Sequence, residues 1–207
     1  WSFVGAPSWV TLSPASGTGN MQVRIGVNNN VQTSPREAEF VLRSSLNGLE
    51  RPITVSQKQF EFDASPESFS YEAINSTSTP VSVVCMGGWS VQGAEAWMNV
   101  SPVSGTGNGS ITIAPSTNTE KRIRSGVVRV VSTLNPQLAK EISISQKAFE
   151  FDETAENYSY GALNPGSTSI TIDAMGAWSV ENIPTWVNVS PASGSGDGRI
   201  TITPQQN

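Results

Sequence analysis

The chain has 207 residues, a net charge of −5, one cysteine and no histidine. Without histidine it cannot form a Ser–His or Cys–His catalytic pair and lacks the commonest zinc ligand, and one cysteine allows no intramolecular disulfide. Five basic and three acidic side chains lie in residues 1–58 (+2), six and seven in 59–147 (−1), and one and seven in 148–207 (−6). This acidic C-terminal part argues against nucleic acid as a partner, and no apolar run approaches the roughly 18 residues that a membrane span needs.

One block of sequence recurs three times, and self-similarity of this kind indicates an array of equivalent structural units. Each copy opens on a tryptophan and continues through a second tryptophan, a Ser-Pro pair and a Gly-x-Gly pair, with a step of 88 residues and then 89. The tryptophan pairs are Trp1 and Trp9, Trp89 and Trp97, and Trp178 and Trp186. We call the three segments the first unit (1–58), the middle unit (59–147) and the last unit (148–207).

The first unit is expected to be a partial domain, because Trp1 aligns with Trp89. It therefore lacks counterparts of residues 60–88, which include the opening strands of the middle unit. Its closing Ser56-Gln57-Lys58 returns as Ser145-Gln146-Lys147 at the end of the middle unit.

The middle unit is the one complete copy, and it consists of short predicted strands separated by turns rich in Gly, Asn, Ser and Pro. Residues 60–63 and 68–73 alternate apolar and polar side chains, as strands with one buried face do. Further strands are predicted at 80–86, 89–91, 98–100, 110–114, 126–132 and 141–145. Because no segment shows a convincing apolar stripe at helical period, the sequence predicts an all-β sandwich or barrel.

The last unit is also expected to be partial. Asn207 aligns with Asn118, so the two closing strands that end in Ser-Gln-Lys have no counterpart. An open sheet edge would result, and we expect either a longer parent chain or strands supplied by neighbouring molecules. The joints between units are short, at 57–60 and 146–149, which predicts a stiff rod because only a long Gly/Ser segment would act as a flexible tether.

Several recurring positions are predicted to serve the fold. Cys85 corresponds to Ala174, which indicates a small buried side chain and not a reactive thiol. Trp89 and Trp178 begin short alternating strands, and we expect them to fill the core. The glycines of the Gly-x-Gly pairs are predicted to adopt positive φ in a tight turn, since a phosphate loop would require a following helix and usually a lysine.

The combined pattern resembles the BACON domain family over essentially the whole chain. It comprises the two tryptophans, Ser-Pro-x-Ser-Gly-x-Gly, an Ile-Thr-Ile strand, an asparagine, an arginine and a closing strand that ends on glutamine. The last three are Asn118, Arg124 and Gln146 in the middle unit, and Asn30, Arg36 and Gln57 in the first.

The resemblance implies immunoglobulin-like β-sandwich domains from a secreted or surface protein of Bacteroidetes or of their phages. With the repeat, we expect a tandem array of such domains with short linkers and incomplete terminal units. It brings no catalytic motif, cofactor or metal, so no enzyme activity is expected. The leading hypothesis is a non-catalytic structural spacer of an exported surface protein. Two alternatives are open: a module that binds mucin or polysaccharide, and a subunit of an extracellular fibre or phage tail with strand complementation between chains. The expected partners are glycans, neighbouring copies or other modules, at an extracellular, cell-surface or virion location.

If the chain binds carbohydrate, aromatic side chains are the candidate residues, because a flat pyranose face stacks on an exposed ring. Trp97 and Trp186 follow turn-like segments and could cap an open end of a sandwich, although their recurrence also fits a core role. Tyr71 and Tyr160, on the second strand of their units, complete the set of candidates.

Arg36 and Arg124 occupy equivalent loop positions before a strand. A guanidinium carries five N–H donors, so the favoured role is to hold the loop through hydrogen bonds to carbonyl groups. Ligand binding is the alternative.

Overall fold

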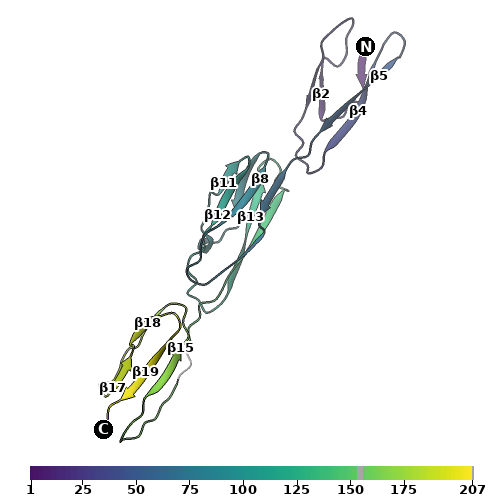
Figure 1. The fold of residues 1–207 in the computed structure, drawn as a ribbon. Coiled ribbons are helices and arrows are strands. Elements are labelled where there is room, and N and C mark those ends of the chain that lie inside the picture. The colour runs from purple at the N-terminus through teal and green to yellow at the C-terminus, as the bar shows by residue number, and fades with distance from the viewer. Residues whose placement is uncertain (153–155, 207) are drawn as a thin grey trace.

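The computed structural model describes residues 1–152 and 156–206, which are rich in β-strands. Figure 1 shows three β-rich units arranged end to end, with the N-terminus in the first and the C-terminus in the last. Among the described residues the one helical element is a 3₁₀ turn, Ala96–Met98, and no helix there is long and apolar enough to cross a membrane. The prediction of an all-β chain is confirmed.

The middle unit contains strands β6 (Phe62–Ser65), β7 (Ser68–Tyr71), β8 (Thr79–Cys85), β9 (Gly88–Gln92), β10 (Val100–Ser101), β11 (Ser104–Thr106), β12 (Gly109–Ile113), β13 (Arg124–Ser132) and β14 (Ala139–Gln146). They form two sheets, with strand orders β10-β12-β8-β6 and β11-β9-β13-β14-β7. Paired strands are antiparallel except β14 and β7, which run parallel. The two sheets enclose one core and make a sandwich.

Side chains at alternate positions of the strands fill that core. In β8, Val81, Val83 and Cys85 are buried while the residues between them face solvent, as the two-residue period of a strand requires. The opposite sheet contributes Val128, Val130, Ile142 and Ile144. Burying an aliphatic side chain of this size stabilises the fold by about 1.5–3 kcal/mol, so the middle unit has a substantial core of its own. The prediction that Cys85 is a buried small side chain is confirmed.

The first unit contains β1 (Ser2–Val4), β2 (Val10–Ser13), β3 (Arg24–Val27), β4 (Arg36–Arg43) and β5 (Glu50–Gln57). One sheet has the order β1-β4-β5, and β2 pairs with β3. These strands correspond to β9-β13-β14 and β10-β12 of the middle unit. Val10 and Phe40 are buried between them.

The last unit contains β15 (Thr168–Ile172), β16 (Ala177–Ser179), β17 (Val187–Ser190), β18 (Ser193–Ser195) and β19 (Gly198–Pro204), arranged as β15-β19-β17 and β16-β18. Its core contains Ala174, Trp178 and Ile200. Residues 157–160, the counterpart of β7, form no strand. In the middle unit β7 pairs with β14, and no described residue of the last unit corresponds to β14.

The predicted strand at 60–63 lies two residues further along, at β6 (Phe62–Ser65). The reason is the joint between the units. The backbone N–H of Phe60 donates to the carbonyl of Gln32 in the first unit, at 2.7 Å. Phe60 is therefore tied to the preceding unit while its ring packs in the core of the middle one.

Candidate functional site

The first tryptophan of each unit lies over its Gly-x-Gly pair. Trp89, only 3% exposed, donates its Nε1–H to the carbonyl of Gly107 at 3.0 Å. Trp178 makes the same bond to Gly196 at 2.9 Å. A buried indole needs such an acceptor, and the prediction that these two tryptophans fill the core is confirmed.

The two glycines of each pair have different roles. Gly107 has a φ of 71°, as predicted for a tight turn. Gly105 does not have positive φ, but a Cβ there would stand closer than 3.0 Å to the ring of Trp89. The prediction of positive φ is therefore wrong for Gly105, the first glycine of the pair. Glycine is required there for a different reason, because the backbone and the indole of Trp89 approach too closely to leave room for a Cβ.

An arginine covers the face of the second tryptophan in the first and middle units. The guanidinium carbon of Arg36 lies 4.5 Å from the ring centroid of Trp9, and that of Arg124 lies 4.5 Å from Trp97. Cation–π contacts of this kind contribute about 0.5–2 kcal/mol. Each arginine also donates from Nη2 to a loop carbonyl at 2.6 Å, which confirms the prediction that Arg36 and Arg124 hold a loop.

Arg124 is positioned by Gln146, which lies directly opposite it in the register of β13 and β14. Arg124 Nε donates to Gln146 Oε1 at 2.9 Å, and Arg124 Nη2 donates to the carbonyl of Ser116. Gln146 is fully buried, and its Nε2 donates to the carbonyls of Glu72, Ala73 and Ser116 at 3.0–3.1 Å. The pair thus ties two loops to the closing strands.

Two of the predicted carbohydrate residues have little free ring surface. Tyr71 is 6% exposed, and its hydroxyl donates to the carbonyl of Ile113 at 3.4 Å. Trp97 is half-buried, lies under Arg124, and donates Nε1–H to Glu95 Oε2 at 2.9 Å. Tyr71 therefore presents no ring face on which a sugar could stack, and the covered face of Trp97 offers no platform.

An asparagine fastens the end of the middle unit to its loop and to the next unit. Asn118 is fully buried, and its Nδ2 donates to the carbonyls of Arg122 at 3.0 Å and Lys147 at 2.7 Å. Its Oδ1 accepts the backbone N–H of Glu120 at 3.1 Å. The carbonyl of Glu120 then accepts the N–H of Phe149, the first aromatic residue of the last unit, at 2.8 Å.

The same arrangement occurs at the other joint. Asn30, 8% exposed, donates to the carbonyls of Ser34 and Lys58, both at 2.9 Å, and accepts the N–H of Gln32 at 3.2 Å. The carbonyl of Gln32 accepts the N–H of Phe60 at 2.7 Å. We call these two hydrogen-bond sets the asparagine clamps. Buried polar side chains that are fully bonded make a backbone segment rigid.

The first joint has a further contact, from the hairpin loop between β13 and β14. Asn135 Nδ2 donates to the carbonyl of Val31 at 2.8 Å. Next to it in sequence, Leu134 lines the hollow at this joint together with Phe60. The middle unit therefore holds the first unit by a side chain as well as by the connecting backbone.

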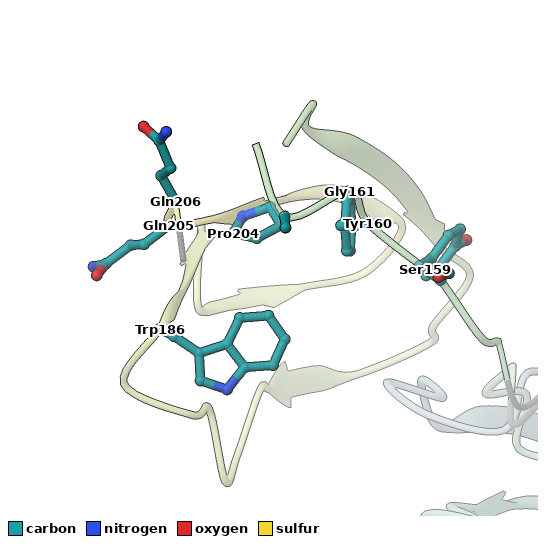
Figure 2. A pocket seen from close by; sticks show the side chains of 9 residues that line it. Ser159, Tyr160, Gly161, Trp186, Pro204, Gln205 and Gln206 are labelled. Atoms are coloured by element: carbon teal, nitrogen blue, oxygen red, sulfur yellow. The ribbon is translucent and has the colours of Figure 1, made fainter. Parts of the chain in front are cut away.

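The last unit differs from the other two around its second tryptophan. Trp186 is 56% exposed and lines a cavity of about 590 Å³ with Tyr160 and the chain from Pro204 to Gln206. Figure 2 shows the indole of Trp186 on one side of this cavity and Tyr160 with Gly161 across from it. The hydroxyl of Tyr160 is buried and has no hydrogen-bond partner among the described residues. We call this cavity the Trp186 groove.

Of the four candidate carbohydrate residues, Trp186 and Tyr160 line one cavity, whereas Tyr71 and Trp97 pack in the core cluster of the middle unit. The asparagine clamps were not predicted as sites. Asn30 and Asn118 recur at the period of the repeat, and this recurrence was the sequence signal that could have marked them. That they bind a loop to the end of the closing strand can be recognised only in the structure, where the two segments lie side by side.

A pair of acidic side chains lies in the last unit. A hydrogen bond with Asp197, and then the charge of Asp197, raise the pKa of Asp173 above its usual value. Asp197 Oδ1 also accepts the N–H of Ala174 at 3.1 Å, as Asn108 accepts that of Cys85 in the middle unit at 3.0 Å. In the described part of the chain no group of three acidic or cysteine side chains is placed to hold a metal ion.

Comparisons with known proteins agree with the repeat. The BACON family model, described as "Putative binding domain, N-terminal", matches residues 1–58 and 87–147, and the model of the viral BACON domain matches 141–206. No curated protein matches the chain.

Among solved structures, a GH5 xyloglucanase of Bacteroides ovatus, in complex with a XXXG heptasaccharide, is similar over 48% of this chain and 21% of its own, at 16% identity and a TM-score of 0.39. The endo-fucoidan hydrolase MfFcnA4, from glycoside hydrolase family 107, is similar over 99% of this chain and 34% of its own, at 12% identity and a TM-score of 0.31. This chain thus spans about a third of the length of the fucoidan hydrolase and about a fifth of that of the xyloglucanase.

Proposed function

The chain belongs to the BACON domain family, and from that premise we propose that it is a non-catalytic spacer that holds other modules apart at a fixed distance. We place this role outside the cell, in an exported surface protein or a virion. The observation that carries the proposal is the repetition of the asparagine clamp at both joints.

The clamps support a spacer because they act on the one place where a tandem array can bend. Asn118 fixes the loop and the last residue of the middle unit, and the same loop accepts the N–H of Phe149, the second residue of the last unit. Asn30 repeats this at the other joint. A joint of three or four residues with its backbone bonded on both sides has little freedom to rotate.

The side chains that recur also support a structural role. The face of Trp97 lies against Arg124, and the ring of Trp89 packs on glycine in the core. In the complete middle unit these groups are engaged in the fold, so they are not presented to a substrate or ligand. Catalysis has no support in this set of residues.

The test is the distribution of distances between spin labels on two units. Cys85→Ala provides a background without thiols, and cysteines at Ser143 and Ser193, both exposed, accept the labels. We expect one narrow distance distribution across the second joint in the native sequence. Asn118→Ala should broaden it severalfold, because two carbonyls and one N–H lose their partner.

A matched control is Asn108→Ala, which removes a similar side-chain bond inside the middle unit and should leave the distribution narrow. A broad distribution for the native sequence would refute the spacer proposal. So would an Asn118→Ala chain with unchanged width, because the clamp would then have no part in stiffness.

Carbohydrate binding is the second candidate function, and one observation favours it. Trp186 presents an exposed ring beside the polar side chains of Gln205 and Gln206. If a polysaccharide binds there, the fluorine NMR signal of 5-fluorotryptophan at position 186 should shift on titration while that of Trp97 stays fixed. A flat titration with a panel of soluble polysaccharides would remove this candidate.

A further inference from the structure

The loop of the β13–β14 hairpin, residues 133–138, contacts the loop between β3 and β4 of the first unit, residues 30–35. We infer that residues 133–138 form a latch: they recognise this loop of the preceding unit and thereby fix the rotation of the first unit on the middle unit. The inference deepens the proposed spacer function and rests on it. The asparagine clamps stiffen a joint, and the latch sets the angle at which the first joint is stiff.

The loop of the first unit is bound at two adjacent carbonyls by two separate parts of the middle unit. The carbonyl of Gln32 accepts the N–H of Phe60 at 2.7 Å, and the carbonyl of Val31 accepts from Asn135 Nδ2 at 2.8 Å. Phe60 belongs to the connecting backbone, so its bond alone would let the first unit turn about the connection. Domains joined in this way move relative to one another by default. Asn135 adds a second point of attachment on a different hairpin, which removes that freedom.

An apolar contact accompanies the second hydrogen bond. Leu134 lines a hollow of about 310 Å³ at the joint, together with Val31, Phe60 and Met86. Leu134 is 49% exposed and Met86 is 58% exposed, so the hollow covers only part of each side chain. Rotation that carried Val31 away from Leu134 would expose more apolar surface to water, and this cost opposes the rotation.

The latch keeps its shape through bonds within the middle unit. Asn135 Oδ1 accepts the N–H of Gln137 at 3.2 Å, which leaves Nδ2 as the group that donates to the first unit. The N–H of Leu138 donates to the carbonyl of Asn135 at 2.9 Å. Leu134 lies so close over Gly87 that a Cβ on that glycine would stand 2.5 Å from the leucine Cδ1. A donor that is already held in its bound conformation loses little conformational freedom when it binds.

The first unit carries the same hairpin loop in an exposed position. Its Leu46 and Asn47 align with Leu134 and Asn135 of the latch. Asn47 Oδ1 accepts the N–H of Leu49 at 3.2 Å, which repeats the bond that Asn135 makes within its own loop. Leu46 is nevertheless 97% exposed. The turn therefore forms without contact to another unit, and Asn47 supplies a matched control for Asn135.

The experiment measures rotation at the first joint with two pairs of spin labels, in the Cys85→Ala background. Thr54→Cys accepts one label, and Ser82→Cys or Ser143→Cys accepts the other; all three positions are exposed. Ser82 and Ser143 lie on opposite sheets of the middle unit, so rotation moves Thr54 toward one of them and away from the other. We expect two narrow distance distributions for the native sequence.

Asn135→Asp tests the hydrogen bond between the units. A carboxylate still accepts the N–H of Gln137 but has no hydrogen to donate to the carbonyl of Val31. Both distance distributions should become at least twice as wide, because the second point of attachment is lost. Leu134→Ala, which removes the apolar contact and keeps the hydrogen bond, should widen them as well. It carries the test if Asn135→Asp lowers the unfolding midpoint of the middle unit.

Two controls accompany these variants. Asn47→Asp makes the same chemical change in the exposed hairpin of the first unit and should leave both distributions narrow. The labels at Ser143 and Ser193, which span the second joint, should report an unchanged width in every variant, since the latch acts on the first joint alone.

Three results would overturn the latch. In the first, Asn135→Asp and Leu134→Ala leave both widths unchanged. In the second, Asn47→Asp widens the distributions as much as Asn135→Asp does, so that a charge in a hairpin and not the contact is responsible. In the third, the native sequence gives broad distributions at the first joint and a narrow one at the second, so that the spacer function stands without the latch. Broad native distributions at both joints would instead refute the spacer function and the latch together.

Discussion

The indole of Trp89 lies so close over the backbone of Gly105 that a Cβ on this glycine would overlap the ring. The same indole bonds to the carbonyl of Gly107 at 3.0 Å. The Gly-x-Gly pair therefore forms a turn and also leaves room for the core tryptophan to pack against its backbone. In the last unit Trp178 and Gly194 repeat the close approach.

Gly105→Ala should destabilise the middle unit by about 1–3 kcal/mol, because the added methyl group must displace a buried ring in a packed core. Denaturant unfolding followed by hydrogen exchange of β9 and β13 measures the change. Gly166→Ala is the control, since a Cβ at Gly166 meets no atom within 4 Å and should change stability by less than about 0.5 kcal/mol. Equal effects of the two substitutions would contradict the close-approach explanation.

Much of the fold could be predicted from the sequence, because the patterns that indicate strands and turns lie in short segments of the chain. Alternation in the segment that became β8 and the turn residues between strands indicated short strands, and the recurrence of Trp89 and Trp178 indicated core positions. The boundary near Phe60 could not be predicted, because its N–H is bonded to Gln32 in another unit.

The site was less predictable because its contacts join residues far apart in the chain. That Arg124 lies over Trp97 depends on the register of β13 with β14, which no spacing along the chain states. The contrast between Trp97 and Trp186 is of the same kind. The two residues are equivalent in the repeat and differ only in what covers them.

Gln146→Ala should cost about 3 kcal/mol in the middle unit, because three carbonyls and Arg124 Nε lose their buried partner at once. The equivalent Gln57→Ala should cost only about 1 kcal/mol in the first unit. There the glutamine is half-buried and donates to a single carbonyl, that of Asn28, besides accepting from Arg36. Hydrogen exchange of β14 and β5 measures the two effects, and equal losses would contradict the difference in burial.

Cys85 should not react with a thiol reagent in the folded chain, because it is 2% exposed within the core. Cys85→Ala should cost only about 1 kcal/mol, since Ala174 fills the equivalent buried position in the last unit. The rate of thiol labelling with and without denaturant tests the first statement, and the unfolding midpoint tests the second. Rapid labelling without denaturant would show that the middle unit opens locally.

Asp197→Asn should flatten the pH dependence of the stability of the last unit. The hydrogen bond with Asp197 and the charge of Asp197 raise the pKa of Asp173 in the fold above its usual 3.8. A carboxyl group raised in this way stabilises the fold while protonated, below pH 3.8, and that contribution is lost as the pH rises through the folded pKa. Asparagine removes the repulsion and can still accept the N–H of Ala174, as Asn108 accepts that of Cys85.

Carbon NMR titration of the Asp173 carboxyl should therefore give a lower pKa in Asp197→Asn, and the exchange protection of β15 at neutral pH should be equal or greater. Asp197→Ala, which lacks the acceptor, should lower the same pKa but lose protection at the N–H of Ala174. An unchanged Asp173 titration in Asp197→Asn would show that the two carboxyl groups are not coupled.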